Sequence, residues 1–115
     1  MKINIKKAGN LITPALEEYI EEKLMPLAKF VKHFDETGEA EMWLEVSRTS
    51  GHHQKGDVFK VAADLRLPHK ILRAEEHADD VHKAIDATKD MLHAEIEKYK
   101  TQLGDVRHQR REGKE

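Results

Sequence analysis

The sequence predicts an α+β fold in the order β-α-β-β-β-α, a four-stranded sheet with two helices packed on one face. Hydrophobic residues alternate with polar ones in several short segments, and they recur every three or four residues in two longer ones. Strands joined by short polar connections, with helices supplied at both ends of the series, favour an antiparallel-rich sheet. The length of 115 residues fits one domain with a single core.

The first strand and the first helix are predicted in the N-terminal third of the chain. Residues 2–7 alternate in polarity, which is typical of a half-buried strand. Thr13 is expected to cap a helix that begins at Pro14, where the missing N–H of proline is harmless. The apolar face of this helix is predicted to comprise Leu16, Ile20, Leu24, Leu27 and Val31. Pro26 should kink the helix or end it early, and a turn at 35–38 should close the unit.

Three more strands are expected in the middle of the chain. Residues 40–46 and 59–66 alternate in polarity, and a polar hairpin loop at 50–56 with a glycine near each end joins them. Pro68 interrupts this pattern, and residues 71–74 are short enough for an edge strand.

The second helix is predicted from about His77, where the hydrophobic period becomes helical. Its recurring positions are Val81, Ile85, Thr88, Leu92, Ile96, Tyr99 and Leu103. Acidic residues cluster at 75–90, and those near the helix start would complement its dipole. Gly104 is expected to stop the helix. We therefore predict one domain over residues 1–104, followed by a disordered polar tail over 105–115.

Composition limits the classes of function. The chain has no cysteine, which excludes disulfides, a thiol nucleophile and cysteine-bearing metal sites. Its first residues are too polar for a signal peptide and no long apolar run is present, so a cytoplasmic protein without a membrane partner is expected. The formal net charge is −2 although charged residues make up 37% of the chain, so any RNA-binding face must be local.

No pattern indicates catalysis or a bound cofactor. The eight histidines show no metal-ligand spacing such as HExxH, and they are expected to be solvated. Neither the nucleophile pattern GxSxG nor the phosphate-cradling pattern GxxxxGK[ST] is present. We predict a protein that is not an enzyme and that has no metal, no cofactor and no small-molecule substrate.

Two sets of cationic residues are candidates for RNA contact. On a helical wheel, four residues of the second helix fall within roughly 40° of one another beside its apolar face: His82, Lys89, His93 and Lys100. They could follow a row of phosphates, or they could form a solvated flank with ordinary side-chain pairs. The second set comes from the hairpin loop and the strand ends, and comprises Lys55, Arg66, Lys70 and Arg73. These residues could dock a partner or protect a sheet edge from aggregation.

Trp43 is the only tryptophan and lies on the strand face opposite Met42 and Leu44. If the helices cover one sheet face only, Trp43 lies on the other. It could then stack on a base or meet a protein partner, or it could be partly buried against the neighbouring strand.

Four segments within about residues 1–103 carry a resemblance to a known family: Ile12-Thr13-Pro14-Ala15-Leu16, Glu22-Lys23-Leu24, Ala84-Ile85-Asp86 and Lys98-Tyr99-Lys100. With the order of elements, the size and the second helix, they resemble the short ribosome hibernation-promoting factors, also called ribosome-associated inhibitor or protein Y. Members of this family bind the small ribosomal subunit between head and body, in the channel used by messenger RNA and the anticodon ends of transfer RNAs.

The resemblance implies phosphate-binding roles for four lysines, namely Lys23, Lys29, Lys98 and Lys100. Where the family usually has basic or polar residues, this chain has Met91, Ala94 and Glu95. The flank that these positions share with Lys98 is therefore less basic than in the family. Docking could instead have shifted toward the ridge of His82, Lys89, His93 and Lys100.

We therefore expect a ribosome-binding translation regulator, monomeric when free, whose partner is ribosomal RNA of the small subunit. It would exclude messenger and transfer RNA sterically and keep idle ribosomes inactive. The chain ends without the extra domain with which long family members pair ribosomes, so pairing by that route is not expected. The alternative is a protein-interaction or regulatory module on the same fold, with little affinity for RNA.

Overall fold

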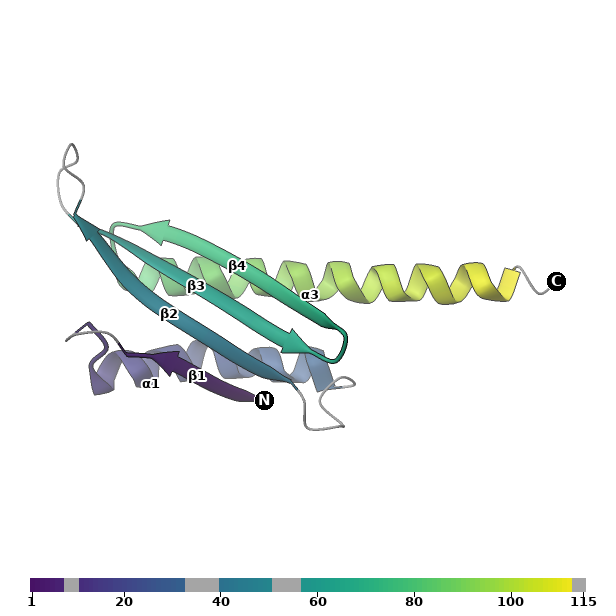
Figure 1. Cartoon of the computed structure of the whole chain (residues 1–115), viewed down its shortest axis with the longest axis horizontal. Helices are drawn as coiled ribbons and strands as arrows, with labels where there is room; N and C mark the ends of the chain where they lie inside the picture. The colour runs from purple at the N-terminus through teal and green to yellow at the C-terminus, as the bar shows by residue number, and fades with distance from the viewer. Residues whose placement is uncertain (8–10, 33–39, 51–56, 113–115) are drawn as a thin grey trace.

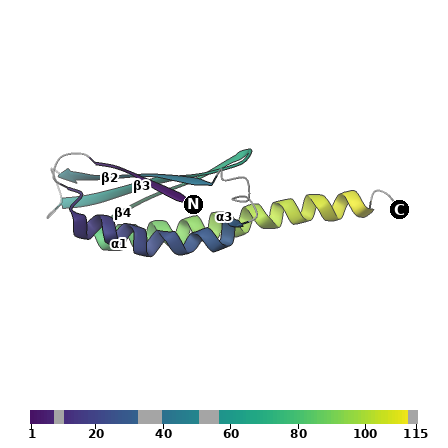
Figure 2. The same ribbon diagram turned by 90° about the horizontal axis from the view of Figure 1, so that it is seen from below.

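The computed structural model describes residues 1–7, 11–32, 40–50 and 57–112 (Figure 1). The elements follow the order β1 (Lys2–Lys6), α1 (Pro14–Leu24), the 3₁₀ helix η1 (Met25–Val31), β2 (Glu41–Ser50), β3 (Asp57–Leu67), β4 (Lys70–Ala78) and α3 (Val81–Glu112). Helices α1 and α3 lie on the same face of the sheet, and the other face carries no helix (Figure 2). The predicted fold class and element order are confirmed.

The sheet has the strand order β1-β2-β3-β4, so consecutive strands are neighbours. Two antiparallel pairs join β2 to β3 and β3 to β4, as an antiparallel-rich sheet requires. β1 pairs with β2 in parallel, which is possible because α1 and η1 form the crossover between them. Asn4 at the centre of β1 fixes this register, since its Nδ2 donates to Glu41 Oε1 (2.7 Å) and to the Met42 carbonyl (3.2 Å).

The first helix begins and changes form where its sequence predicts. The Thr13 Oγ1 accepts a hydrogen bond from the backbone N–H of Leu16 at 3.1 Å, and Pro14 occupies the first turn. Pro26 lacks an N–H and its ring clashes with the carbonyl four residues earlier, so the α-helical ladder cannot continue through it. The chain responds by tightening to the 3₁₀ helix η1, which keeps Leu27 and Val31 buried in the core.

The core fills the space between the sheet and the helices. Alternate strand residues contribute Met42, Leu44, Val46, Val61, Ala63, Leu65, Leu72 and Ala74, all buried. The helices contribute Leu16, Ile20, Leu24, Ile85, Leu92 and Ile96, also buried. Thr88 is the one buried polar side chain among the described residues, and its Oγ1 donates to the Ala84 carbonyl at 2.8 Å. This apolar layer holds α1 and α3 in fixed positions relative to each other.

Three predicted boundaries were wrong. β4 extends to Ala78 rather than ending at Ala74, and α3 begins at Val81 rather than near His77. Glu75 and Glu76 therefore belong to the strand and do not serve the helix dipole. At the other end α3 runs to Glu112, past the stop predicted at Gly104. The division into a domain over 1–104 and a tail over 105–115 stays a prediction.

The connections between strands are described in part. β3 and β4 are joined through Pro68 and His69, and His69 has a φ of 66°, in the left-handed region. Proline followed by a residue of positive φ is the arrangement of a type II turn. The predicted turn at 35–38 and the loop at 51–56 lie outside the described residues.

Candidate nucleic-acid interface

The two helices meet along a line of aromatic and cationic side chains, which we call the helix seam: Tyr19, Lys23, Lys29, Phe30, His82, His93 and Lys100. At one end the rings of Tyr19 and His82 meet edge to face with centroids 4.5 Å apart. Lys23 Nζ lies 5.6 Å from the centre of the same tyrosine ring. A cation over an aromatic face is attracted by the ring quadrupole, so the ring holds the ammonium group close to the seam.

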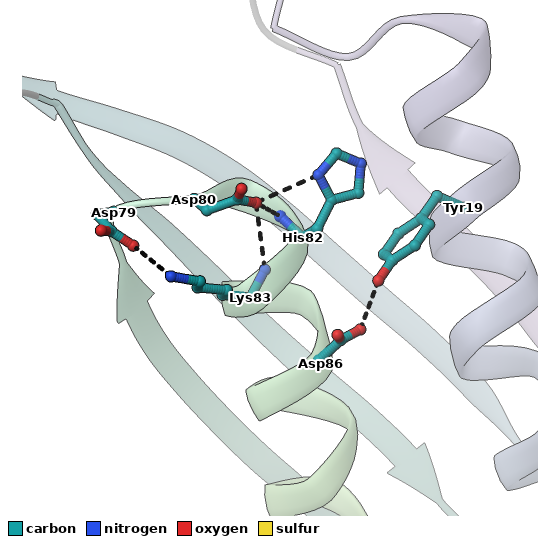
Figure 3. Close-up of polar contacts among 6 residues, drawn as sticks. All are labelled: Tyr19, Asp79, Asp80, His82, Lys83 and Asp86. Carbon is teal, nitrogen blue, oxygen red and sulfur yellow. Dashed lines mark hydrogen bonds and ion pairs between the residues drawn. The ribbon is translucent and has the colours of Figure 1, made fainter.

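The Tyr19 hydroxyl fastens α1 to the first turns of α3. It donates a hydrogen bond to Asp86 Oδ1 at 2.7 Å (Figure 3). This hydrogen bond to a carboxylate, together with partial burial and the nearby acids, raises the pKa of Tyr19 to about 12. The phenol is therefore neutral at physiological pH and acts as a structural donor.

At the other end of the helix seam, Phe30 is surrounded by cationic or titratable groups. The ring of His93 stacks on Phe30 with centroids 4.3 Å apart. Lys29 Nζ and Lys100 Nζ lie 5.1 Å and 5.8 Å from the Phe30 ring centre. His93 Nε2 is also 3.7 Å from Glu97 Oε1, an ion pair only when the histidine is protonated. Two ammonium groups from different helices are thus gathered at one ring.

The start of α3 explains part of the acidic cluster. Asp80 Oδ1 accepts from the backbone N–H of His82 at 2.7 Å and lies 3.2 Å from His82 Nδ1 (Figure 3). The backbone hydrogen bond from His82 is the main reason that the pKa of Asp80 lies below its usual range. Asp79 Oδ1 is 3.4 Å from Lys83 Nζ. Asp80 therefore caps the helix and Asp79 pairs with Lys83, as acids at a helix start commonly do.

The face of the sheet opposite the helices presents cations that are matched by acids. Arg73 makes two hydrogen bonds to Asp64, from Nε to Oδ1 at 2.7 Å and from Nη2 to Oδ2 at 3.1 Å. The Arg73 guanidinium holds the pKa of Asp64 below its usual range. Arg66 lies over the ring of Trp43, with Cζ 5.2 Å from the centroid, and 43% of Trp43 is exposed. We call this surface the open sheet face.

The remaining predicted cations lie at the sheet edge or within α3. Lys70 and Lys98 line one small hollow of ≈ 100 Å³ between β4 and α3, with Lys70 Nζ 5.8 Å from the ring of Tyr99. Lys89 is half-buried on α3, at a position between His82 and His93. Lys55 lies outside the described residues.

The structure therefore divides the predicted site residues among three surfaces. Five of them gather at the helix seam: Lys23, Lys29, His82, His93 and Lys100. Sequence reasoning missed Tyr19 and Phe30, although each aromatic residue stands close to a lysine of the same helix, at Lys23 and Lys29. That proximity was the available signal, because an aromatic residue beside the apolar stripe of a helix can support a neighbouring cation.

Two kinds of site find no support in the described part of the chain. Within it, no three side chains of the types that ligate metals gather closely enough to hold an ion. No helix there combines the length and hydropathy needed to span a bilayer.

Comparison with known protein families decides the family. The model of the family described as "Sigma 54 modulation protein / S30EA ribosomal protein" matches residues 3–104. The chain belongs to this family. It is a family of ribosome-associated factors rather than of enzymes.

Two curated relatives are named ribosome hibernation promotion factor. The protein of Deinococcus radiodurans is 33% identical over 90% of this chain and 49% of its own length. The protein of Bacillus subtilis is 29% identical over 90% of this chain and 50% of its own length. The chain thus spans about half the length of these curated relatives.

Two solved structures share the fold. A ribosomal subunit interface protein from Coxiella burnetii matches with a TM-score of 0.66 at 24% identity, over 88% of this chain and 99% of that one. The N-terminal domain of Thermus thermophilus Protein Y matches with a TM-score of 0.55 at 23% identity, over 85% and 94% of the two chains. At these identities the likeness shows the fold alone.

The three residues predicted to stand at basic or polar positions of the family lie on the same flank of α3 as Lys98. Met91 is 40% exposed and Ala94 is exposed, while Glu95 lines the hollow together with Lys70 and Lys98. A carboxylate beside two ammonium groups lowers the local positive potential. The cations of the helix seam are on a different flank of α3, so these differences do not reach them.

Proposed function

We propose that this chain binds the small ribosomal subunit, occupies the channel of messenger and transfer RNA, and keeps idle ribosomes inactive. Membership of the S30EA family and two relatives named ribosome hibernation promotion factor support the ribosome as partner. In this proposal the free protein is a cytoplasmic monomer that acts without catalysis.

The arrangement of lysines at the helix seam is the main support for the proposed RNA contact. Lys23, Lys29 and Lys100 have their ammonium groups 5.1–5.8 Å from the centres of two aromatic rings. Among the described residues these three lysines have no ion pair, in contrast to Lys6, Lys60 and Arg73 of the open sheet face. Ammonium groups that are held in place and not neutralised by a carboxylate suit the phosphates of a folded RNA.

The mechanism would be steric. The chain measures 61 × 30 × 18 Å along its principal axes, so its short dimension is that of a sheet with one layer of helices. In this proposal the folded chain blocks the channel by its bulk, and lysines on its helical face bind phosphates of the channel wall. Phosphate contacts position a protein and carry no sequence code, which fits a factor that must recognise every idle ribosome.

The test is co-sedimentation of the purified chain with small subunits and with whole ribosomes in sucrose gradients. We expect the chain to migrate with small subunits at 50 mM salt, to dissociate progressively toward 200 mM, and to be displaced by transfer RNA. Absence from the small-subunit fractions at low salt would overturn the proposal. Migration that transfer RNA does not affect would place the chain outside the decoding channel.

A second candidate function is docking of a protein on the open sheet face. It is favoured by two exposed apolar side chains there, Trp43 at 43% and Ile71 at 59%. An apolar contact responds weakly to salt, whereas RNA binding responds strongly. Association that persists at 200 mM salt and is lost in Trp43→Ala would support protein docking over RNA binding.

A further inference from the structure

His93 lies where α3 packs against η1. Its ring stacks on Phe30 with centroids 4.3 Å apart and an interplanar angle of 29°, and 44% of its side chain is exposed. The Nζ atoms of Lys29 and Lys100 lie 5.1 Å and 5.8 Å from the centre of the same Phe30 ring. Phe30 thus gathers three basic side chains, of which the two lysines are charged at neutral pH and the histidine can titrate.

The charged groups that face His93 come from η1 and from α3 itself. Lys29 of η1 and Lys100 of α3 share the Phe30 ring, and Glu97 Oε1 lies 3.7 Å from His93 Nε2. About one turn before His93, α3 carries a cation and an acid that offset each other, Lys89 and Asp90. At the ring, two lysines against one glutamate leave one net positive charge, and protonation of His93 makes it two.

The charged groups of α1 and of the sheet lie near other parts of α3. Glu22 and Lys23 of α1 lie near Tyr19, which contacts the first turns of α3. On the helix side of the sheet, three strand residues with described side chains are charged: Arg48 and Glu76 at the end where α3 begins, and Lys70 in the hollow beside Tyr99. The protonation state of His93 therefore has a direct effect on the charge at Phe30.

Glu97 does not cancel the effect of a proton on His93. The distance of 3.7 Å is longer than a hydrogen bond, and 44% and 54% of the two side chains are exposed. Ion pairs between side chains with this much exposure are weak. The carboxylate is also present in both protonation states, so protonation still adds one positive charge beside two ammonium groups. A phosphate at Phe30 would then meet three cations instead of two.

His82, the other histidine of the helix seam, lies among acids. Its Nδ1 is 3.2 Å from Asp80 Oδ1, which accepts from the backbone N–H groups of His82 and Lys83 (Figure 3). Asp79 and Asp86 also lie on this part of the chain. A proton on His82 would offset an existing negative charge, so we expect it to add little to phosphate binding.

We propose that His93 makes phosphate binding at the helix seam depend on pH, so that the chain binds RNA of the small subunit more tightly as the pH falls from about 8 to about 6. This inference rests on the proposed function and adds a regulation to it. A protonated imidazole donates from both ring nitrogens and can bind a phosphate oxygen directly. The Phe30 ring would hold this cation in place, as it holds the ammonium groups of Lys29 and Lys100.

The test measures Kd for the full chain and purified small subunits by pelleting at about pH 8 and about pH 6, each at about 50 and 200 mM salt. For the wild type, the lower pH should tighten binding at 200 mM salt by roughly 3-fold, because one more phosphate contact is made. The salt-induced change in Kd should grow by roughly 3-fold for the same reason. In His93→Gln, which cannot be protonated, both changes should be absent. All variants meet the same ribosomes, so a change that remains in His93→Gln comes from other groups.

Three further variants separate the charge of His93 from the fold and from other histidines. His93→Arg carries a permanent cation on a planar group, so it should bind at both pH values as tightly as the wild type does at the lower one. His82→Gln changes the acidic end of the helix seam, and His77→Gln changes the open sheet face beside Lys60. Both should keep the pH dependence of the wild type. Thermal unfolding followed by circular dichroism at both pH values checks that each variant is folded.

The outcomes distinguish this inference from the proposed function. If the wild type binds small subunits at neither pH, the proposed function is wrong and the role of His93 is wrong with it. If the wild type binds with the same Kd and salt dependence at both pH values, the role of His93 alone is overturned. It is equally overturned if His93→Gln keeps the response of the wild type, or if His82→Gln loses it.

Discussion

Cationic side chains lie on both sides of the sheet, but their neighbours differ. On the open sheet face, three basic side chains are paired with carboxylates: Arg73–Asp64 at 2.7 Å, Lys6–Glu45 at 2.9 Å and Lys60–Glu75 at 3.6 Å. At the helix seam, Lys29 and Lys100 approach an aromatic ring. A carboxylate next to a cation offsets the positive potential that a phosphate would meet. An aromatic ring attracts the cation but carries no net charge, so the positive potential remains.

This difference explains how a chain with a net charge of −2 could bind RNA. The acids are not spread evenly, because the cross-strand pairs of the open sheet face and the start of α3 use many of them. At the Phe30 end of the helix seam, on the other side of the sheet, Lys29 and Lys100 have no carboxylate partner among the described residues. Net charge therefore describes the solubility of this protein better than its choice of partner.

The largest expected effect compares two neighbours on β2 that point to opposite faces. Leu44 is 2% exposed under the helices and Trp43 is 43% exposed on the open sheet face. Leu44→Ala should lower the free energy of unfolding by about 2–5 kcal/mol, because it leaves a cavity in the core. Trp43→Ala should lower it by only about 1 kcal/mol.

Urea unfolding followed by circular dichroism measures both values. If Trp43→Ala destabilised the protein as much as Leu44→Ala, the open sheet face would be covered in solution. The description of one sheet face as covered and the other as open would then be wrong.

The next prediction concerns ribosome binding. It compares two double variants, each of which removes two cations from one side of the sheet. Lys29→Gln/Lys100→Gln removes two cations from the helix seam, and Arg66→Gln/Arg73→Gln removes two from the open sheet face. Loss of two phosphate contacts should weaken binding to small subunits by roughly 10-fold at 200 mM salt. The sheet-face variant should bind within about 2-fold of the wild type, because Arg73 is already paired with Asp64 and the proposed RNA contact lies on the other face of the sheet.

Dissociation constants from pelleting with purified small subunits show which face of the sheet makes the RNA contact. A larger loss for the sheet-face variant would assign the RNA contact to the open sheet face. An equal loss for both would indicate that only total charge matters.

Much of the fold could be predicted because its signals are local. The alternation in β2 and β3, the cap at Thr13 and the break at Pro26 depend on neighbours in sequence. The end of β4 does not, since Glu75 and Glu76 show no apolar alternation. They are held in the strand by pairing with Ala62 and Val61 of β3. Helix α3 likewise continues past Gly104, where a glycine suggested an end.

The candidate site could be predicted only in part, for a similar reason. The wheel of α3 correctly placed His93 and Lys100 on one flank. Their contact with Phe30 depends on how α1 and η1 lie against α3, which is set by the packing of the whole core. The separation of Arg66 and Arg73 from the helix seam depends on the sheet between them, which a list of basic residues does not reveal.

The smallest expected effect concerns the hydrogen bond between Tyr19 and Asp86, which joins the two helices at the helix seam. In a Tyr99→Phe background, Tyr19 is the only tyrosine, and its absorbance should titrate with a pKa of about 12. Replacing Asp86 with Asn removes the charged acceptor, so the pKa of Tyr19 should fall toward 10, the ordinary value for tyrosine. The Arg73-paired Asp64 on the open sheet face provides the control, since Asp64→Asn should leave the Tyr19 titration unchanged.

The same bond gives a stability that depends on pH with a defined sign. The pKa of Tyr19 is raised in the folded state, so the contribution is fully present below the unfolded pKa near 10 and is lost as pH rises toward 12. Asp86→Asn should therefore destabilise the chain by no more than about 1 kcal/mol at pH 8, and the difference from wild type should shrink between pH 10 and 12. Urea unfolding at both ends of this range tests it. A difference that stayed constant would mean that Asp86 stabilises the helix seam through contacts other than the tyrosine hydroxyl.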